Sequence, residues 1–144
     1  MNPTNVNDKL SIAGQPSPAD FAGIAAAGFA AVINSRPDGE EDGQPGSAAE
    51  ASSAQQAGLA YAHVPVTLKD IRESDVRAFQ AALSSAEGPV LAHCKSGARA
   101  LTLFVLGEVL DGRMRAGDVR AFGEAHGHNL AAADAWLAVR GAQS

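Results

Sequence analysis

The chain has 144 residues, enough for one domain with its own core, and its composition of 46% hydrophobic and 19% charged residues is that of an ordinary globular protein. A formal net charge of −5, with 11 scattered basic residues, argues against a nucleic-acid surface. No apolar run approaches the length of a membrane span, and the first residues lack the features of a signal peptide. We therefore expect a single cytoplasmic domain over residues 1–144, with residues 1–8 flexible and no membrane partner.

The first half of the chain alternates short apolar runs with stretches of helical spacing. Ser17 and Pro18 fit the cap and first position of a helix, and Ser35–Gly46, dense in Pro, Gly and acidic residues, is a loop. Ser47 followed by Glu50 has the spacing of a capping box at a second helix. These patterns predict strands at Lys9–Gly14, Phe29–Asn34 and Leu59–Val66, and helices at Pro18–Ala27 and Ser47–Ala57.

The second half contains the most apolar helical pattern of the chain. A polar loop, Thr67–Arg72, leads to a helix that begins at Glu73 or Ser74. The patterns then predict a strand at Val90–His93 and helices at Ala98–Leu110, Ala116–Ala125 and Asn129–Val139. Strands that alternate with helices indicate a three-layer α/β fold, with helices on both faces of a central, mostly parallel sheet. In such sheets ligands bind at the carboxyl ends of the strands.

The stretch from Val90 to Leu101 passes from a predicted strand through a glycine-containing turn into the apolar helix. Free N–H groups at a helix start, together with the positive end of the helix dipole, make an anion site. Cys94 is the only cysteine, so it forms no internal disulfide, and at the first position of this loop its thiolate is favoured. Arg99 adds a planar charged fork suited to an oxyanion. We interpret the loop as a cysteine nucleophile aimed at a bound oxyanion.

Three segments in this order resemble a known family. They are Ser11-Ile12-Ala13-Gly14-Gln15-Pro16, then Val32-Ile33-Asn34-Ser35-Arg36-Pro37-Asp38 with Glu40 or Glu41 after it, and His93-Cys94-Lys95-Ser96-Gly97-Ala98-Arg99, which follows Tyr61-Ala62-His63-Val64-Pro65-Val66. Over Leu10 to Leu110 the chain resembles the phosphatase-like domain of beta-lactamase-hydrolase-like proteins, a bacterial relative of dual-specificity and tyrosine phosphatases. The resemblance implies a tyrosine-phosphatase-like fold and a hydrolase without a metal or other cofactor.

Placed on this chain, the family's roles make Cys94 the nucleophile and Arg99 the clamp on the oxyanion, while the backbone from Lys95 to Ala98 cradles the substrate. Two details depart from the phosphatase pattern. Four residues separate Cys94 from Arg99, where the phosphatase signature has five, and four is the spacing of many rhodanese sulfurtransferases. Ala100 stands where phosphatases usually carry Ser or Thr to assist the leaving thiolate.

A phosphatase mechanism also needs a general acid to protonate the departing alkoxide. In the polar loop before the third helix we choose Asp70, because Asp75 falls within that helix, and Asp38 is a rival from an earlier loop. We expect Arg36 and Gln15 to line the same crevice, with Arg36 binding substrate. The alternative for Arg36 is an ion pair with Asp38 or Glu40 at the surface.

The four histidines are expected to be structural. His93 points to the opposite side of an extended strand from Cys94, so it is not the base, and we expect it to be buried and hydrogen-bonded. His63 precedes Pro65 and has no chemical partner in the pattern. His126 and His128 have no carboxylate or thiol at ligand spacing, so no metal site is expected there.

Two reactions and one non-catalytic role fit these residues. In the leading hypothesis the Cys94 thiolate attacks a phosphomonoester, Arg99 and the loop amides stabilise its oxygens, and Asp70 protonates the leaving group. In the second, Cys94 takes sulfane sulfur from thiosulfate or a persulfide and passes it to a thiol, which tolerates Ala100. In the third, the loop binds an anion or a partner protein without catalysis. Either enzyme takes a small anionic substrate, and the fold does not decide the chemistry. The sequence leaves the oligomeric state open.

Overall fold

A computed structural model describes residues 2–141, which form the three-layer α/β fold expected from the sequence. The strands are β1 (Thr4–Asn5), β2 (Leu10–Ala13), β3 (Ala31–Asn34), β4 (Ala60–His63) and β5 (Val90–His93). The helices are α1 (Asp20–Ala26), α2 (Ser47–Gln56), α3 (Glu73–Ser85), α4 (Ala98–Leu110), α5 (Val119–Ala125) and α6 (Ala131–Val139), with a 3-10 turn, η1, at Ala116–Asp118. Across residues 2–141, every helix is too short or too polar to span a membrane.

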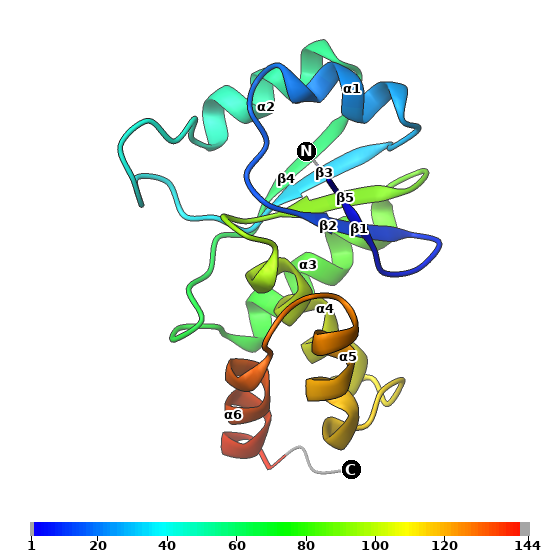
Figure 1. Ribbon diagram of the computed structural model, residues 1–144, viewed down its shortest axis with the longest axis vertical. Coiled ribbons are helices and arrows are strands. Elements are labelled where there is room, and N and C mark those ends of the chain that lie inside the picture. The colour runs from blue at the N-terminus through cyan, green and yellow to red at the C-terminus, as the bar shows by residue number, and fades with distance from the viewer. Residues whose placement is uncertain (1, 142–144) are drawn as a thin grey trace.

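The sheet has the strand order β1-β2-β5-β3-β4, in which β1 is antiparallel and the other strands are parallel. Helices α1 and α2 cover one face of the sheet, and α3 and α4 cover the other, with α5 and α6 beyond them (Figure 1). Alternate strand residues fill the two cores, because successive side chains point to opposite faces: Ile33 and Ala92 face α4, whereas Val32 and Leu91 face α1. Cys94 therefore emerges at the carboxyl end of the central strand.

The N-terminal segment that we expected to be flexible contains a paired strand. Thr4 and Asn5 pair with Ile12 and Ser11 along the edge of β2. The chain can reverse here because the Asn7 side chain accepts the N–H groups of Lys9 and Leu10, at 2.9 and 2.8 Å, and so forms the turn that joins the two strands. The short antiparallel strand covers an otherwise open sheet edge.

Three helix starts and one cap differ from the predictions. Helix α5 begins at Val119, after the 3-10 turn, instead of Ala116, and α6 begins at Ala131 instead of Asn129. Helix α1 begins at Asp20 instead of Pro18, and the Asp20 carboxylate accepts the Ser17 N–H at 2.8 Å, so Ser17 is not the cap. Helix α2 begins at Ser47 after Gly46, and the expected capping box is wrong. The Glu50 side chain points into the protein and is only 2% exposed, because it contacts the buried His93 side chain and not the N–H groups at the helix start.

Candidate active site

Cys94 directly follows β5, and the loop that it begins leads into α4. The Gly97 N–H donates a hydrogen bond to Cys94 Sγ at 3.0 Å, and Gly97 is the residue that precedes α4. Gly97 has a φ of 105°, in the left-handed region that favours glycine, and a Cβ there would lie 3.2 Å from His128 Nε2. The turn therefore requires glycine, and it brings an N–H from the helix start to the sulfur.

The connection between β2 and α1 holds this loop from one side. The Gln15 N–H donates to the Lys95 carbonyl at 3.1 Å, and a Cβ at Gly14 would lie 2.9 Å from the same oxygen. Inside the loop, Ser96 Oγ accepts the Ala98 N–H at 3.4 Å. The Lys95 and Ser96 side chains are exposed, whereas Gly97 is buried. These contacts fix the loop backbone in advance, as a preorganised anion site requires.

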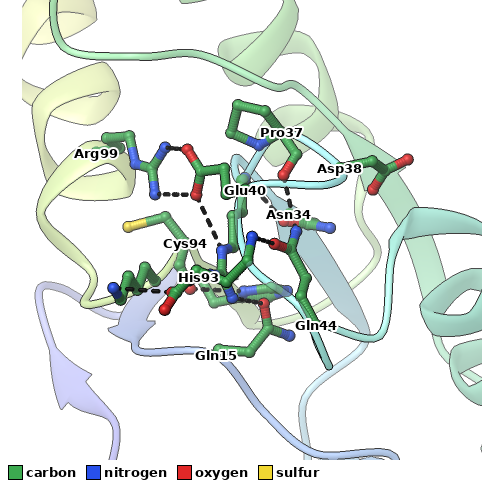
Figure 2. Close-up of polar contacts among 12 residues, drawn as sticks. Gln15, Asn34, Pro37, Asp38, Glu40, Gln44, His93, Cys94 and Arg99 are labelled. Atoms are coloured by element: carbon green, nitrogen blue, oxygen red, sulfur yellow. Dashed lines mark hydrogen bonds and ion pairs between the residues drawn. The ribbon is translucent and has the colours of Figure 1, made fainter.

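Arg99 lies in the first turn of α4 and is held by Glu40. Its two terminal nitrogens donate to the two Glu40 carboxylate oxygens at 2.6 and 3.0 Å, and one of them also donates to the Val66 carbonyl at 3.2 Å. Figure 2 shows the Arg99 guanidinium facing Glu40, with the Cys94 sulfur below it. No hydrogen bond within residues 2–141 uses the Arg99 Nε–H, so that edge of the guanidinium is available to an oxyanion.

The ion pair shifts the titration of both partners. The hydrogen bond from Arg99 lowers the pKa of Glu40 to about 2, with Arg36 adding to the effect against partial burial. In return, the Glu40 carboxylate raises the pKa of Arg99, and the nearby Cys94 acts in the same direction. Glu40 is therefore an ionised carboxylate at neutral pH, which positions Arg99 but cannot donate a proton.

Arg36, which we expected to bind substrate, is 4% exposed and fully engaged within the protein. Its Nε donates to Glu40 at 3.0 Å, and its terminal nitrogens donate to Gln15 at 3.0 Å and to Glu41 at 2.7 Å. Glu41 also pairs with Lys95 at 2.8 Å, and this contact is the main cause that lowers the pKa of Glu41. The expected alternative, an ion pair between Arg36 and Glu40, is thus present, but the Arg36 side chain is buried behind the two glutamates and not at the surface.

A buried polar pair lies beneath the loop. His93 Nε2 is 2.7 Å from Glu50 Oε1, and His93 Nδ1 is 3.1 Å from the Cys94 carbonyl oxygen. The other Glu50 oxygen accepts hydrogen bonds from Asn34 at 3.1 Å and from Gln15 at 3.2 Å. Both ring nitrogens of His93 therefore lie within hydrogen-bond distance of oxygens. The expectation that His93 is buried and hydrogen-bonded is confirmed.

A pocket of about 680 Å³ opens beside Arg99. Its walls carry both signs of charge and are formed by Glu40, Glu41, Thr67, Leu68, Lys69, Lys95 and Arg99. Asp70, our choice for the general acid, is exposed, and its N–H donates to the Thr67 carbonyl at 3.1 Å. It is not among the residues that line this pocket, although its neighbours Leu68 and Lys69 are.

Asp38, the rival acid, is tied to the start of α2. Its carboxylate accepts the Ser47 hydroxyl and the Ser47 N–H, both at 2.7 Å, and these bonds lower the pKa of Asp38, the hydroxyl first. The carboxylates at the pocket are instead Glu40 and Glu41. We expected no role at the Cys94 loop for Glu40 and Glu41 beyond the family segment and a pair with Arg36, and we assigned Glu50 to a helix cap, so the place of these three acids around the loop was missed.

The remaining histidines have structural contacts. His63 Nε2 lies 2.8 Å from the Arg36 carbonyl, and His126 Nδ1 lies 2.8 Å from the Phe122 carbonyl. His128 packs against Gly97, and desolvation lowers its pKa. Within residues 2–141, no group of three or more His, Cys, Asp or Glu side chains is arranged to hold a metal ion.

The family model for the phosphatase-like domain of beta-lactamase hydrolase-like protein matches residues 4–111. The chain belongs to this family. Over 137 residues it is 54% identical to a beta-lactamase hydrolase-like protein of Agrobacterium fabrum and 50% identical to one of Xylella fastidiosa. Each match covers 95% of this chain but 32% of the relative, so the chain spans about a third of the length of these proteins.

Solved structures share the phosphatase-like fold. A candidate phosphatase of Neisseria meningitidis superimposes with a TM-score of 0.82 at 34% identity, covering 93% of this chain and 94% of its own. TpbA of P. aeruginosa superimposes with a TM-score of 0.71 at 19% identity, covering 99% and 89% of the two chains, and this likeness shows the fold alone. The tyrosine-phosphatase-like fold expected from the sequence is confirmed, and the family supports a phosphatase-like enzyme.

Proposed function

We propose that this phosphatase-like domain is a cysteine-dependent hydrolase of phosphomonoesters with Cys94 as its nucleophile. The observation that carries the proposal is the 3.0 Å hydrogen bond from the Gly97 N–H to Cys94 Sγ at the start of α4. This N–H, the positive end of the helix and the Arg99 guanidinium place donors and positive charge around the sulfur, which suits a nucleophile that binds an anionic substrate. A neighbour in fold, TpbA, has been solved with pTyr bound, which is consistent with a phosphate ester as substrate.

In the first step, the loop amides from Lys95 to Ala98 and the free Nε–H edge of Arg99 would bind the phosphoryl oxygens. The Cys94 sulfur attacks phosphorus, and the S–P bond forms as the P–O bond to the leaving group breaks. Because Asp70 stands outside the pocket and Glu40 is ionised, the departing alkoxide takes its proton from water in this arrangement.

In the second step, water attacks the phosphorus of the phosphocysteine. The S–P bond breaks, Cys94 leaves with the electron pair as a thiolate, and both protons of the water end on the released phosphate. Charge is stabilised throughout by fixed donors, chiefly the Gly97 N–H and Arg99.

Sulfur transfer is a second candidate, which the short loop favours. Four residues separate Cys94 from Arg99, Ala100 offers no hydroxyl, and the carboxylate that contacts Arg99 is not an acid at neutral pH. In this reaction the Cys94 thiolate attacks the outer sulfur of thiosulfate, an S–S bond forms and sulfite leaves. An acceptor thiolate then attacks the outer sulfur of the Cys94 persulfide, and Cys94 departs again as a thiolate.

The two reactions are separated by one comparison of the wild-type protein with Cys94→Ser. Each protein is incubated with an aryl phosphate and, separately, with thiosulfate. Phosphate release that requires Cys94 supports hydrolysis, and sulfite release with a persulfide on Cys94 supports sulfur transfer. If the wild-type protein is inactive on both substrates, both reactions are refuted and the loop is an anion- or partner-binding module, whereas activity that persists in Cys94→Ser refutes Cys94 as the nucleophile. Asp70→Asn serves as the control and should retain the wild-type rate within about two-fold, since its carboxylate lies outside the pocket.

A further inference from the structure

Ser35 carries a buried hydroxyl without a hydrogen-bond partner. The residue is 0% exposed, and among the buried side-chain nitrogens and oxygens of residues 2–141 its Oγ is the one left unpaired. Buried polar atoms in folded proteins nearly always have a partner, because an unpaired one has lost its bonds to water without replacement. An isolated exception next to a candidate reaction centre points to a role during the reaction.

Ser35 lies between the segments that hold the two reacting groups. Its N–H donates to the His93 carbonyl at 2.8 Å, so it sits beside the residue that leads into Cys94. Its own carbonyl accepts the Val66 N–H at 3.1 Å, and the Val66 carbonyl in turn accepts a hydrogen bond from Arg99. The Ser35 backbone is therefore bonded to the segments on both sides of the Cys94–Arg99 site.

The sheet register places the Ser35 and Cys94 side chains on the same face. Asn34 and His93 are partners on adjacent parallel strands, and both contact Glu50 on the α2 side of the sheet. In extended chains the next residue points to the opposite face. Ser35 and Cys94 are those next residues, each directly after the end of its strand, so the alternation places both side chains on the α4 side of the sheet.

We propose that the Ser35 hydroxyl is the donor that stabilises the Cys94 sulfur when it leaves as a thiolate. Ala100 cannot supply such a donor from α4. In both candidate reactions the last step breaks a bond to this sulfur, S–P or S–S, and the electron pair stays on Cys94. A rotation of the unpaired Ser35 hydroxyl toward the sulfur adds a hydrogen bond to the developing charge, and no proton is transferred. This inference rests on the proposed role of Cys94 as the nucleophile.

Ser35→Ala tests the proposal, because it removes the hydroxyl and leaves every backbone contact in place. Thiolate formation is followed by ultraviolet absorbance during a pH titration, with the full chain as the sample. The signal belongs to Cys94, the only cysteine, and burial raises the pKa of Tyr61, the only tyrosine, away from the measured range. Loss of one donor to the thiolate should move the midpoint to higher pH by about half a unit to one unit.

Two further variants separate a specific donor from a general effect of mutation. Ser11→Ala removes another buried hydroxyl of the sheet and should leave the midpoint unchanged. Ala100→Ser, placed in the Ser35→Ala background, supplies a hydroxyl from α4 and should restore the wild-type midpoint. In turnover, Ser35→Ala should slow the release of Cys94 from its covalent intermediate about ten-fold, so that the intermediate accumulates.

The outcomes distinguish this proposal from the one on which it rests. If the midpoint of thiolate formation and the turnover rate of Ser35→Ala equal those of the wild type, the donor role of Ser35 is overturned, even though Cys94 remains the nucleophile. If Cys94→Ser keeps full activity, the nucleophile is refuted. In that case, a shifted midpoint of thiolate formation in Ser35→Ala still supports a contact between the Ser35 hydroxyl and the Cys94 thiolate. An unshifted midpoint refutes this contact too.

Discussion

Replacing Glu50 with Ala should destabilise the fold more than any exposed substitution, because Glu50 is the shared acceptor of a buried network. Its carboxylate contacts His93 at 2.7 Å, Asn34 at 3.1 Å and Gln15 at 3.2 Å, and it is 2% exposed. Glu50→Ala leaves the buried His93 and Asn34 side chains without this acceptor, and at about 1–3 kcal/mol for each unsatisfied group the cost is about 2–6 kcal/mol. A domain of this size typically has about 5–15 kcal/mol of stability, so the variant would lose a large share of it.

Urea unfolding followed by circular dichroism measures this change as a lower midpoint with an unaltered slope. Glu50→Gln keeps the volume and one acceptor oxygen, and it should cost about 1–3 kcal/mol. Glu124→Ala, on the exposed surface of α5, is the matched control and should change stability by less than about 0.5 kcal/mol. A cost below about 1 kcal/mol for Glu50→Ala would refute the buried network as a stabilising element.

Three other outcomes follow from the site. Gly97→Ala should lower the free energy of unfolding by about 1–3 kcal/mol in urea, because alanine is strained at a φ of 105° and its Cβ would press on His128. A variant as stable as the wild type would contradict this. Ser35→Ala should leave stability unchanged or raise it by up to about 1 kcal/mol, since the lost hydroxyl has no partner, whereas a clear loss of stability would show an unseen bond. Glu40 has a pKa lowered from 4.5 to about 2, so the stability that it contributes is complete above pH 4.5 and is lost as the pH falls toward 2. The stability of Glu40→Gln, measured by unfolding at a series of acid pH values, should therefore fall less between pH 4.5 and 2 than that of the wild type. Identical curves for Glu40→Gln and the wild type would contradict the lowered pKa of Glu40.

The sequence was sufficient for the features that depend on neighbouring residues. An apolar run, a glycine turn and an apolar helical pattern placed Cys94 between β5 and α4, and the structure has both elements at the predicted residues. Alternation along an extended strand also gave the direction of His93, which is buried on the side opposite Cys94. Local backbone geometry determines both results, so one segment carries the information.

Contacts between distant segments could not be read in this way. Glu50 fits a local capping rule with Ser47, yet it lies 43 residues from its partner His93, and only the packing of α2 on the sheet brings them together. Asp70 was chosen for its place in the chain order, but the direction of an exposed loop decides which acid reaches the pocket. The two departures noticed in the sequence, the four-residue spacing and Ala100, remain the points at which phosphoryl and sulfur transfer differ.

The most direct test of the account is the mass of the intact protein after a rapid acid quench during reaction. With an aryl phosphate, we expect a transient phosphoryl adduct on Cys94 in the wild-type protein. The adduct should live longer in Ser35→Ala and should be absent in Cys94→Ser. A single added sulfur after thiosulfate, with no phosphoryl adduct, would assign the same nucleophile to sulfur transfer. An unmodified wild-type protein with both substrates, or an adduct that persists in Cys94→Ser, would contradict the claim that Cys94 is the nucleophile of this site.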